Sequence, residues 1–247
     1  MMTGKTAIIT GAARGIGRAA AISLASKGAE VIIVDIDERY AADTVDHIKG
    51  KGSKAELYIA DVSKTSDISK MTEYLISKYD GVDILVNNAG ILSKTQIEDL
   101  TEEEWQRVMD VNLKSAVFLV KHCLDHMISQ KWGRIINIAS MAGRMGGFET
   151  GCAYSASKAA LIGFTYCIAR KTAHCNVTVN AIAPGPTSSE LIAGFSPEQR
   201  EKLAAGIPAG RMGKPEEIGH LAAFLASEEA GFITGAVIDI NGGMFMG

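Results

Sequence analysis

The sequence has few of the features that mark a secreted or metal-binding protein. It contains 4 cysteines and 5 prolines among 247 residues. The cysteines form no CxxC pair and no other spacing typical of metal ligands, and a chain of this length can build a core without disulfides. We therefore expect no metal site, and we expect the cysteines to be reduced core residues: Cys123, Cys152, Cys167 and Cys175.

Long apolar stretches and runs of like charge are also absent. No uninterrupted apolar segment reaches about 18 residues, the length that a membrane-spanning helix requires, and the first ten residues do not have the parts of a secretory signal. The formal net charge is −3, with acidic and basic residues interspersed. This pattern does not indicate binding to nucleic acid or to an anionic membrane. We expect a cytoplasmic protein whose partners are small molecules.

Short apolar runs alternate along the chain with amphipathic segments. The apolar runs cover 5–10, 30–35, 55–60, 82–87, 134–139, 177–183 and 236–240. The amphipathic segments cover 15–28, 38–50, 65–79, 102–130, 152–173 and 215–227. Such apolar runs are typical of strands buried on both faces, and their alternation with helices calls for crossovers in a parallel sheet. The pattern predicts an α/β fold: a Rossmann-like, doubly wound sheet of seven parallel strands with helices on both faces, forming a single domain over 1–247.

A glycine-rich loop follows the first predicted strand. It reads TGAARGIG and leads directly into the predicted helix 15–28. Glycines permit a tight turn and a close approach to a pyrophosphate, which then meets the N–H groups at the start of the helix. Such a loop alone is weak evidence, but the strand-loop-helix context that supports nucleotide binding is present. The predicted contacts are Gly11, Arg14, Gly15, Ile16 and Gly17.

The second predicted strand ends in an acid. Asp35 lies 18 residues after Gly17, where dinucleotide folds place a carboxylate against the adenosine ribose. A carboxylate accepts the ribose hydroxyl protons but repels a 2′-phosphate, so Asp35 favours NAD over NADP. Arg14 favours the opposite choice, because its guanidinium could contact a 2′-phosphate. Asp37 is a second candidate for the ribose contact, or else an N-cap for the helix 38–50.

Short polar or small residues follow the third and fourth predicted strands. They are Asp61 with Val62, and Asn88 with Ala89 and Gly90. Aspartate and asparagine also close ordinary turns by local hydrogen bonds, so each alone carries little weight. Because ligands of such sheets bind outside the carboxyl ends of the strands, we include all five among the predicted cofactor contacts.

Taken together, these motifs resemble the short-chain dehydrogenase/reductase family over essentially the whole chain. The resemblance rests on TGAARGIG, the Asp61-Val62 pair, NNAG at 87–90, Ser140, and YSASK at 154–158. It implies an oxidoreductase that transfers a hydride between a nicotinamide cofactor and the carbon of a secondary alcohol or ketone.

Tyr154 is the predicted general acid/base. Hydride transfer leaves a proton to be given to, or taken from, the substrate oxygen. A free tyrosine has a pKa of about 10, too high for a base at neutral pH, but Lys158 lies one helical turn on, where its ammonium would stabilise the phenolate. The same spacing recurs at Tyr74 and Lys78, which we interpret as a solvated surface pair without a further partner. Only the later pair has a serine, Ser140, 14 residues before its tyrosine.

The resemblance also implies the roles of the residues around Tyr154. In the family, the residue that Ser140 matches polarises the substrate oxygen, and the one that Lys158 matches holds the nicotinamide ribose while lowering the tyrosine pKa. Asn112 matches the helix asparagine that supports a water connected to the lysine. The spacing from Ser140 to Tyr154 is one residue longer than is usual in the family, which predicts an insertion within 144–151, beside the substrate.

The turn after the predicted strand 177–183 resembles the family segment that holds the nicotinamide carboxamide. It implies contacts from Pro184, Gly185 and Thr187, with Ser189 as a second hydroxyl candidate.

We predict a substrate lid at about 188–211. It contains Ser196-Pro197-Glu198-Gln199, a helix start with a capping box. A locally helical loop beside the cofactor is suited to closing over the substrate. Its apolar residues could line the substrate site or pack the lid onto the body: Leu191, Ile192, Phe195, Leu203 and Ile207.

Two branches of the family are open for the substrate. The 3-oxoacyl-acyl-carrier-protein reductases usually favour NADPH and present arginines to the acidic carrier, where this chain has Lys131 and Cys175. With Asp35, this difference favours an NAD-dependent dehydrogenase of a free secondary alcohol, and the NADPH-dependent carrier-protein reductase is the alternative. A non-catalytic nucleotide-binding protein is a minor alternative, because Tyr154 and Lys158 are both present.

The predicted helices 102–130 and 152–173 carry apolar residues around much of their circumference, more than one buried stripe requires. In the family these two helices form subunit interfaces. We therefore expect a homotetramer assembled through them.

Overall fold

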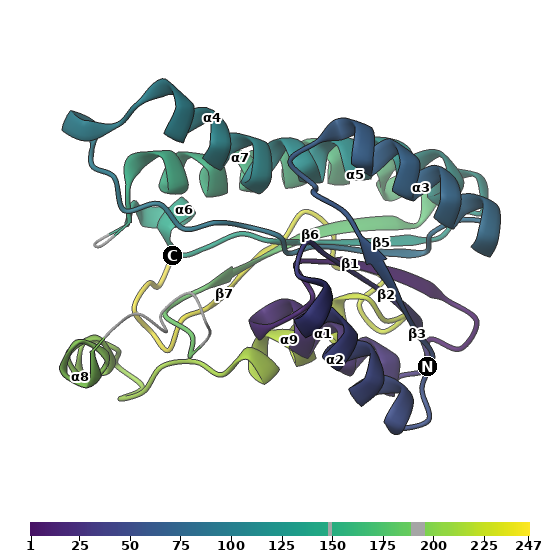
Figure 1. Ribbon diagram of the computed structural model, residues 1–247, viewed down its shortest axis with the longest axis horizontal. Helices are drawn as coiled ribbons and strands as arrows, with labels where there is room; N and C mark the ends of the chain where they lie inside the picture. Colours follow the sequence, from purple (N-terminus) through teal and green to yellow (C-terminus); the bar gives the residue numbers. More distant parts are fainter. Residues whose placement is uncertain (148–149, 189–195) are drawn as a thin grey trace.

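The computed structural model describes residues 1–147, 150–188 and 196–247. Seven parallel strands form one sheet in the order β3-β2-β1-β4-β5-β6-β7 (Figure 1). The strands are β1 (Thr6–Thr10), β2 (Glu30–Asp35), β3 (Ala55–Ile59), β4 (Ile84–Asn87), β5 (Gly133–Ile138), β6 (Val177–Pro184) and β7 (Val237–Ile240). This confirms the predicted Rossmann-like fold.

Helices cover both faces of the sheet, as predicted. One layer consists of α1 (Gly15–Ser26), α2 (Glu38–Gly50) and α9 (Pro215–Leu225), and the other of α3 (Thr65–Tyr79), α5 (Ser115–Ser129) and α7 (Cys152–Thr172) (Figure 1). Successive strand residues point to opposite faces, so Ile9 packs under the first layer and Ile8 under the second. The apolar runs therefore supply two cores, one on each side of the sheet.

The edge strands are less buried than the sequence suggests. All residues of β1 and β4 are buried, whereas every residue of β7 is only half-buried and Ile59 at the end of β3 is 45% exposed. Each edge strand has a neighbour on one side only, so part of its surface remains accessible even though its sequence is apolar. The expectation that all the strands are buried on both faces is wrong for these two.

The predicted helix 102–130 is interrupted. It consists of α4 (Glu102–Met109), a π-helical segment, η2 (Asp110–Lys114), and α5. Single π-turns of this kind are frequent at functional sites. Asn112 lies in this one, 2% exposed, and its amide bonds to backbone outside the helix. Periodicity did not reveal the interruption because the apolar pattern continues on both sides of it.

Short helices complete the structure: η1 (Ile97–Asp99), α6 (Ala142–Met145), η3 (Ala173–Cys175) and α8 (Pro197–Ala205).

All four cysteines are free, but only Cys123 is buried; Cys152 and Cys175 are half-buried and Cys167 is exposed. The prediction of core cysteines is therefore wrong for three of them, which lie near helix ends or on the outer side of α7. Within the described ranges, no helix is both long and apolar enough to span a bilayer.

Helices α1 and α9 are in backbone contact. A Cβ added to Gly219 of α9 would lie 2.6 Å from the carbonyl carbon and oxygen of Ala19 in α1. The missing side chain therefore allows the two helices to approach each other closely, and α1 carries the end of the glycine-rich loop. A Cβ at Gly50, the last residue of α2, meets nothing within 4 Å.

We expect Gly219→Ala to lower the free energy of unfolding by about 1–3 kcal/mol, because the added methyl group overlaps backbone that cannot move away cheaply. Gly50→Ala is the matched control and should leave stability unchanged or raise it by up to about 1 kcal/mol, since alanine is the better helix former. Urea unfolding followed by circular dichroism measures both. Equal effects of the two substitutions would contradict the close packing of α1 on α9.

Candidate active site

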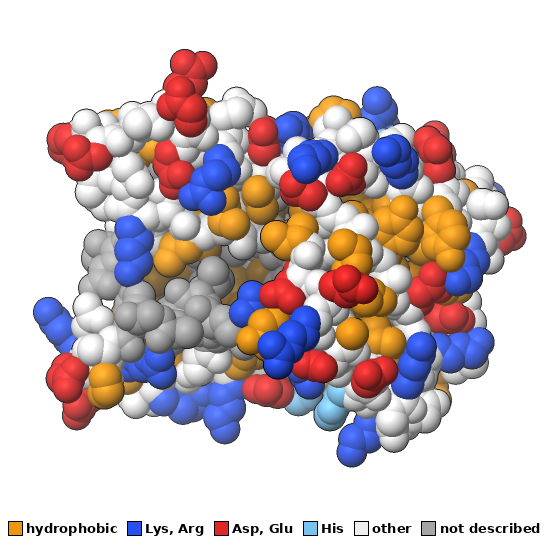
Figure 2. All heavy atoms as spheres, in the orientation of Figure 1, with side chains coloured by type: hydrophobic (Ala, Val, Ile, Leu, Met, Phe, Trp, Pro, Cys, Tyr) orange, Lys and Arg blue, Asp and Glu red, His pale blue; other side chains and the backbone are white. Residues whose placement is uncertain are grey.

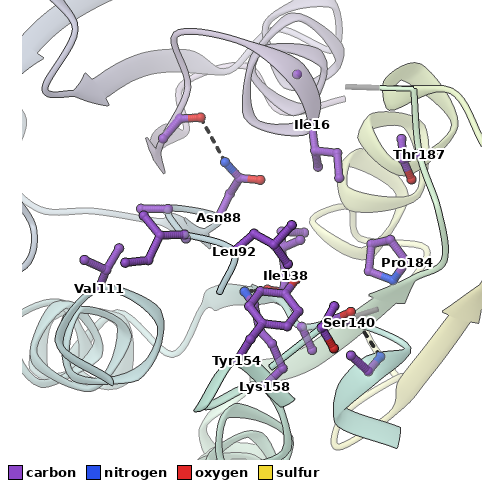
Figure 3. Close-up of a pocket in the computed structure, with 18 of the residues that line it drawn as sticks. Ile16, Asn88, Leu92, Val111, Ile138, Ser140, Tyr154, Lys158, Pro184 and Thr187 are labelled. Carbon is purple, nitrogen blue, oxygen red and sulfur yellow. Dashed lines mark hydrogen bonds between the residues drawn. The ribbon is translucent and has the colours of Figure 1, made fainter. Parts of the chain in front are cut away.

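A cavity of about 700 Å³ opens at the carboxyl edge of the sheet, where ligands of such folds bind. Most of the predicted site residues line it, and Figure 3 shows several of them converging from different strands and helices. The predicted residues in the lining are Gly11, Arg14, Gly15, Ile16, Asp35, Asp61, Val62, Asn88, Ala89, Gly90, Ser140, Tyr154, Lys158, Pro184, Gly185 and Thr187. Gly17 and Asn112 lie behind the lining, and Ser189 lies outside the described residues.

The glycine-rich loop has the shape that a phosphate requires. Gly11 and Gly15 have φ angles of +62° and +54°, which favour glycine. A Cβ at Gly17 would overlap the carbonyl oxygen of Gly11 and the amide of Asn88, so this glycine lets α1 begin directly against the loop. Helix α1 has no side-chain cap, and its first N–H groups are suited to an anion. The loop therefore fits the pyrophosphate of a dinucleotide.

A reciprocal clamp joins the ends of β1 and β4. The side-chain amide of Asn88 donates to the carbonyl oxygens of Thr10 and Gly11, at 2.9 Å each. In return, the Thr10 hydroxyl oxygen accepts from the backbone N–H groups of Asn88 and Ala89, at 3.1 Å each. The Asn88 side chain thus positions the glycine-rich loop. Thr10 is a positioning residue: it begins the TGAARGIG motif but was not among the predicted contacts.

The Asp35 carboxylate lies in the cavity wall at the end of β2. It accepts hydrogen bonds from the backbone N–H groups of Ala13 at 2.9 Å, Ile36 at 2.8 Å and Asp37 at 3.1 Å. These bonds fix the carboxylate in place and tie the glycine-rich loop to β2. Two oxygens that accept three N–H groups keep lone pairs available, so a ribose hydroxyl can still donate to them.

The Arg14 guanidinium, which lines the same cavity as Asp35, contacts a carboxylate and an aromatic ring. Its guanidinium lies 3.8 Å from Asp37 Oδ2 and 4.5 Å from the centroid of the Tyr40 ring. Asp37 also caps α2, accepting from Tyr40 N at 3.3 Å. Arg14 therefore already has a carboxylate partner, and Asp37 acts as the N-cap that was the second interpretation of this residue.

Asp61 closes a turn at the cavity edge. Its carboxylate accepts from the hydroxyl of Ser63 at 2.7 Å and from the backbone N–H of Ser63 at 3.1 Å. The Ser63 hydroxyl bond is the main cause of the lowered pKa of Asp61. The turn places Val62 in the lining beside it.

Three of the four predicted catalytic side chains, Ser140, Tyr154 and Lys158, meet at the inner end of the cavity (Figure 3). Ser140 follows β5, and its Oγ accepts from Ala142 N at 3.1 Å. Tyr154 and Lys158 lie in the first two turns of α7, with the Lys158 ammonium 5.9 Å from the centroid of the Tyr154 ring. Lys158 is 4% exposed and donates to the Ile138 carbonyl oxygen at 2.8 Å.

Burial dominates the protonation of Tyr154 and Lys158. It raises the pKa of the Tyr154 phenol, and a hydrogen bond with Ser140 opposes part of that rise. Burial lowers the pKa of Lys158 to about 8. In both cases the apolar surroundings disfavour the charged form. The pair therefore holds a protonated phenol beside an amine that titrates near neutral pH.

Asn112 joins the π-helical segment to the site. Its Oδ1 accepts from Ile91 N at 2.8 Å, and its Nδ2 donates to Ile91 O at 3.1 Å and to Ser157 Oγ at 3.0 Å. A Cβ at Gly90 would lie 3.3 Å from Lys158 Nζ and 3.4 Å from Asn112 Oδ1, so both groups approach the same glycine. The link from Asn112 to Lys158 through a water stays a prediction.

The segment after β6 forms the opposite wall. A Cβ at Gly185 would lie 2.8 Å from Asn241 Cα, and the buried Thr187 donates its hydroxyl to Gly185 O at 3.0 Å. Beyond it, α8 begins with the predicted capping box of Ser196 and Gln199. Leu203 of α8 lines the cavity. Leu191, Ile192 and Phe195 of the predicted lid lie outside the described residues.

The loop 144–151, where we predicted an insertion, borders the cavity through Gly147 and Thr150; its residues 148–149 are not described. Further lining residues were not predicted, and the signal for most of them is their position just after a strand or inside the π-helical segment. They include Ile36, Ile91, Leu92, Lys94, Val111, Ile138, Met141 and Met244.

The competing Tyr74–Lys78 pair is a surface feature, but it has a partner. Lys78 Nζ donates to Tyr74 Oη at 3.1 Å and to Glu56 Oε2 at 2.5 Å, and Tyr74 donates to Glu56 Oε1 at 3.1 Å. Glu56 comes from β3, which packs beside α3, so the interpretation of an unpartnered pair is wrong. No cavity residue joins this cluster among those described.

The molecular surface, seen in the orientation of Figure 1, carries charges of both signs (Figure 2). Lys and Arg side chains are interspersed with Asp and Glu across the face drawn there, and the hollow lies between the two helix layers.

Comparison with known proteins gives consistent matches over almost the whole chain. The family model described as "Enoyl-(Acyl carrier protein) reductase" matches residues 11–245. The 3-oxoacyl-acyl-carrier-protein reductase FabG of Vibrio cholerae is 42% identical over 246 residues, covering 99% of each chain. The protein of the same name from Escherichia coli is 41% identical over 98% of each chain.

Solved structures agree with this result. A putative gluconate dehydrogenase from Agrobacterium tumefaciens superposes with a TM-score of 0.94 at 34% identity, covering 98% of this chain and 96% of its own. A putative NAD(P)-dependent gluconate 5-dehydrogenase from Beutenbergia cavernae, with bound NADP at low occupancy, has a TM-score of 0.93 at 36% identity, covering 98% and 97%.

The lowered pKa of Lys158 should appear in the pH dependence of stability. Between pH about 8 and the ordinary lysine pKa of about 10.4 the unfolded state binds the proton and the folded state does not, so stability rises with pH in that window. Lys158→Met removes this titration. We expect the free energy of unfolding, from urea titrations at pH 7, 8, 9 and 9.5, to rise for the wild type relative to Lys158→Met above pH about 8, by up to about 1.4 kcal/mol per pH unit. Parallel curves for the two proteins would contradict a buried, titrating amine.

Proposed function

Because this chain belongs to the short-chain dehydrogenase/reductase family, we propose that it reduces the 3-oxo group of an acyl thioester, as a 3-oxoacyl-acyl-carrier-protein reductase. The observation that carries the proposal is the assembly of Ser140, Tyr154 and Lys158 at the inner end of one cavity with the dinucleotide loop. Sequence reasoning favoured a free secondary alcohol instead. Full-length similarity to two carrier-protein reductases supports a 3-oxoacyl thioester substrate better than a free alcohol.

A nicotinamide cofactor, when bound, supplies the hydride for this reduction. The residues of the chain then have to orient the carbonyl and provide a proton. The Ser140 hydroxyl is placed to hold the substrate oxygen next to the Tyr154 phenol. Tyr154 donates its proton to that oxygen, and the Lys158 ammonium beside the ring stabilises the phenolate that remains.

The protonated Tyr154 phenol matches the proton donor that the proposed reduction requires. Burial holds the phenol in its protonated form, which is the form needed to give a proton to a developing alkoxide. Oxidation of an alcohol would require the phenolate, whose formation depends on Lys158 being charged. The pKa of Lys158, about 8, leaves that charge largely in place at neutral pH.

The second candidate is an NAD-dependent dehydrogenase of a free secondary alcohol. It is favoured by Asp35, whose fixed carboxylate occupies the wall where a 2′-phosphate would have to lie. Two solved structures with similar folds are described as putative gluconate dehydrogenases, one of them NAD(P)-dependent with bound NADP. The preference for NAD over NADP stays a prediction, and so do the homotetramer, the closing lid and the single-domain organisation.

We expect Tyr154→Phe to lower kcat for 3-oxoacyl thioester reduction by at least about 100-fold, the usual contribution of a positioned general acid. The phenylalanine keeps the ring and removes only the proton donor. NADH binding, followed by nicotinamide fluorescence, should stay within about twofold of the wild type. Retained turnover would contradict the role of Tyr154, and a wild type that binds NADH but reduces or oxidises nothing would favour the non-catalytic alternative.

The cofactor choice tests Asp35. We expect the wild type to show a higher kcat/KM with NADH than with NADPH, because the carboxylate repels a 2′-phosphate. Asp35→Ala should narrow or reverse this ratio by at least about tenfold, equal to about 1.4 kcal/mol of lost discrimination. Asp43→Ala is the control, because it removes an exposed carboxylate of α2 outside the cavity lining and should leave the ratio unchanged. A wild type that prefers NADPH would refute the interpretation of Asp35.

A further inference from the structure

The C-terminal tail, residues 241–247, folds back from β7 toward the cavity. Gly242 and Gly243 have φ angles of +65° and +89°, which allow the chain to reverse. Asn241 fixes the reversal at both ends: its Oδ1 accepts from Gly243 N at 2.9 Å, and its Nδ2 donates to Phe245 O at 3.0 Å. The tail therefore has a defined path, and Met244 in its middle lines the cavity.

Arg144 anchors the tail at the catalytic end of the cavity. Its guanidinium lies 5.0 Å from the centroid of the Phe245 ring, and it donates to Gly247 O at 3.4 Å. On its other side it lies 3.5 Å from the carboxylate of Asp239 in β7. Arg144 belongs to α6, which begins two residues after Ser140. The tail is thus fastened to α6, the helix that follows Ser140.

The chain that follows α8 packs against the other side of the tail. Ala209 N donates to Gly242 O at 3.0 Å, and a Cβ at Gly242 would lie 2.6 Å from Cγ2 of the buried Ile207. Leu203 of α8 lines the same cavity as Met244. Two apolar side chains from different segments therefore contribute to the cavity wall, one from α8 and one from the tail.

We propose that Met244, held by Arg144 through Phe245, limits the length of the acyl chain that this enzyme accepts. The inference rests on the proposed reduction of 3-oxoacyl thioesters. The alkyl chain of a substrate whose carbonyl lies at Ser140 and Tyr154 has to be buried against the apolar surface of the same cavity. Met244 is the part of that surface contributed by the tail, and its long unbranched side chain occupies space that a longer substrate would need.

Met244→Ala tests the proposal, because it removes the Cγ, Sδ and Cε atoms and leaves the backbone of the tail intact. Met246→Ala is the matched control, since Met246 is 82% exposed two residues away. The probes are the N-acetylcysteamine thioesters of 3-oxobutanoate and 3-oxodecanoate. We expect the kcat/KM ratio of the longer to the shorter substrate to rise at least about tenfold in Met244→Ala, the scale of discrimination by methylene-sized groups in an apolar site. It should stay within about twofold of the wild type in Met246→Ala.

Phe245→Ala tests the anchor. Without the ring under Arg144 the tail is less firmly held, and we expect the same ratio to shift in the same direction by a smaller factor, with NADH affinity unchanged. A ratio that is unchanged or lower in Met244→Ala, or that rises equally in Met246→Ala, overturns the inference while the proposed function stands. Failure of the wild type to reduce either thioester overturns the proposed function itself.

Discussion

The burial of the Lys158 amine is the constraint on which the arrangement of the site depends. An ammonium removed from water has to be hydrogen-bonded, and Lys158 meets that need at the Ile138 carbonyl oxygen, at the end of β5. This bond ties α7 to the strand that Ser140 follows. Helix α6 then packs onto the same turn of α7, where a Cβ at Gly143 would lie 2.6 Å from the Lys158 carbonyl carbon. The lysine, the serine and the tyrosine are therefore placed together by one buried charge and one missing side chain.

The cofactor side of the cavity is organised by polar side chains that bond to backbone. Asn88 and Thr10 fasten β4 to the glycine-rich loop, Asp35 fastens that loop to β2, and Asp61 closes the turn after β3. Each of these side chains satisfies N–H or C=O groups that would otherwise be unpaired at a strand end. Because they are held in this way, the groups that would face a dinucleotide are preorganised before it binds.

The substrate side is built differently. Its wall is mostly apolar and comes from segments far apart in sequence: the turn after β4, the π-helical segment, α8 and the C-terminal tail. Arg144 fastens the tail to α6 and β7, and the chain after α8 packs against the tail through Ile207 and Ala209. The residues of this wall can therefore change without changing Ser140, Tyr154 and Lys158. This is consistent with a fold on which different members of a family act on different substrates.

Much of the fold was predictable from periodicity, because each buried strand is a short apolar run and the long helices lie in the segments between these runs. The interruption at Asn112 was not predictable in this way, since the apolar residues of α4 and α5 keep their spacing across it. The exposure of β3 and β7 was also hidden, because edge position depends on the order of strands in space. Among the site residues, those at strand ends or in motifs could be assigned, whereas Met244 could not, because no local pattern marks it.

The sequence by itself predicted the reaction class and the proposed catalytic group. Its strand-end motifs place Ser140 and the glycine-rich loop at one sheet edge, and the resemblance to a known family implies the role of Tyr154. Only the tertiary structure decided which of the candidate side chains bond to backbone or to each other and which further side chains line the cavity. It showed Arg14 paired with Asp37, Asn88 holding the loop, and Met244 in the cavity wall. The physical reason is that strand-end motifs arise from local chain geometry, whereas these contacts join residues brought together only when the sheet and its helices have packed.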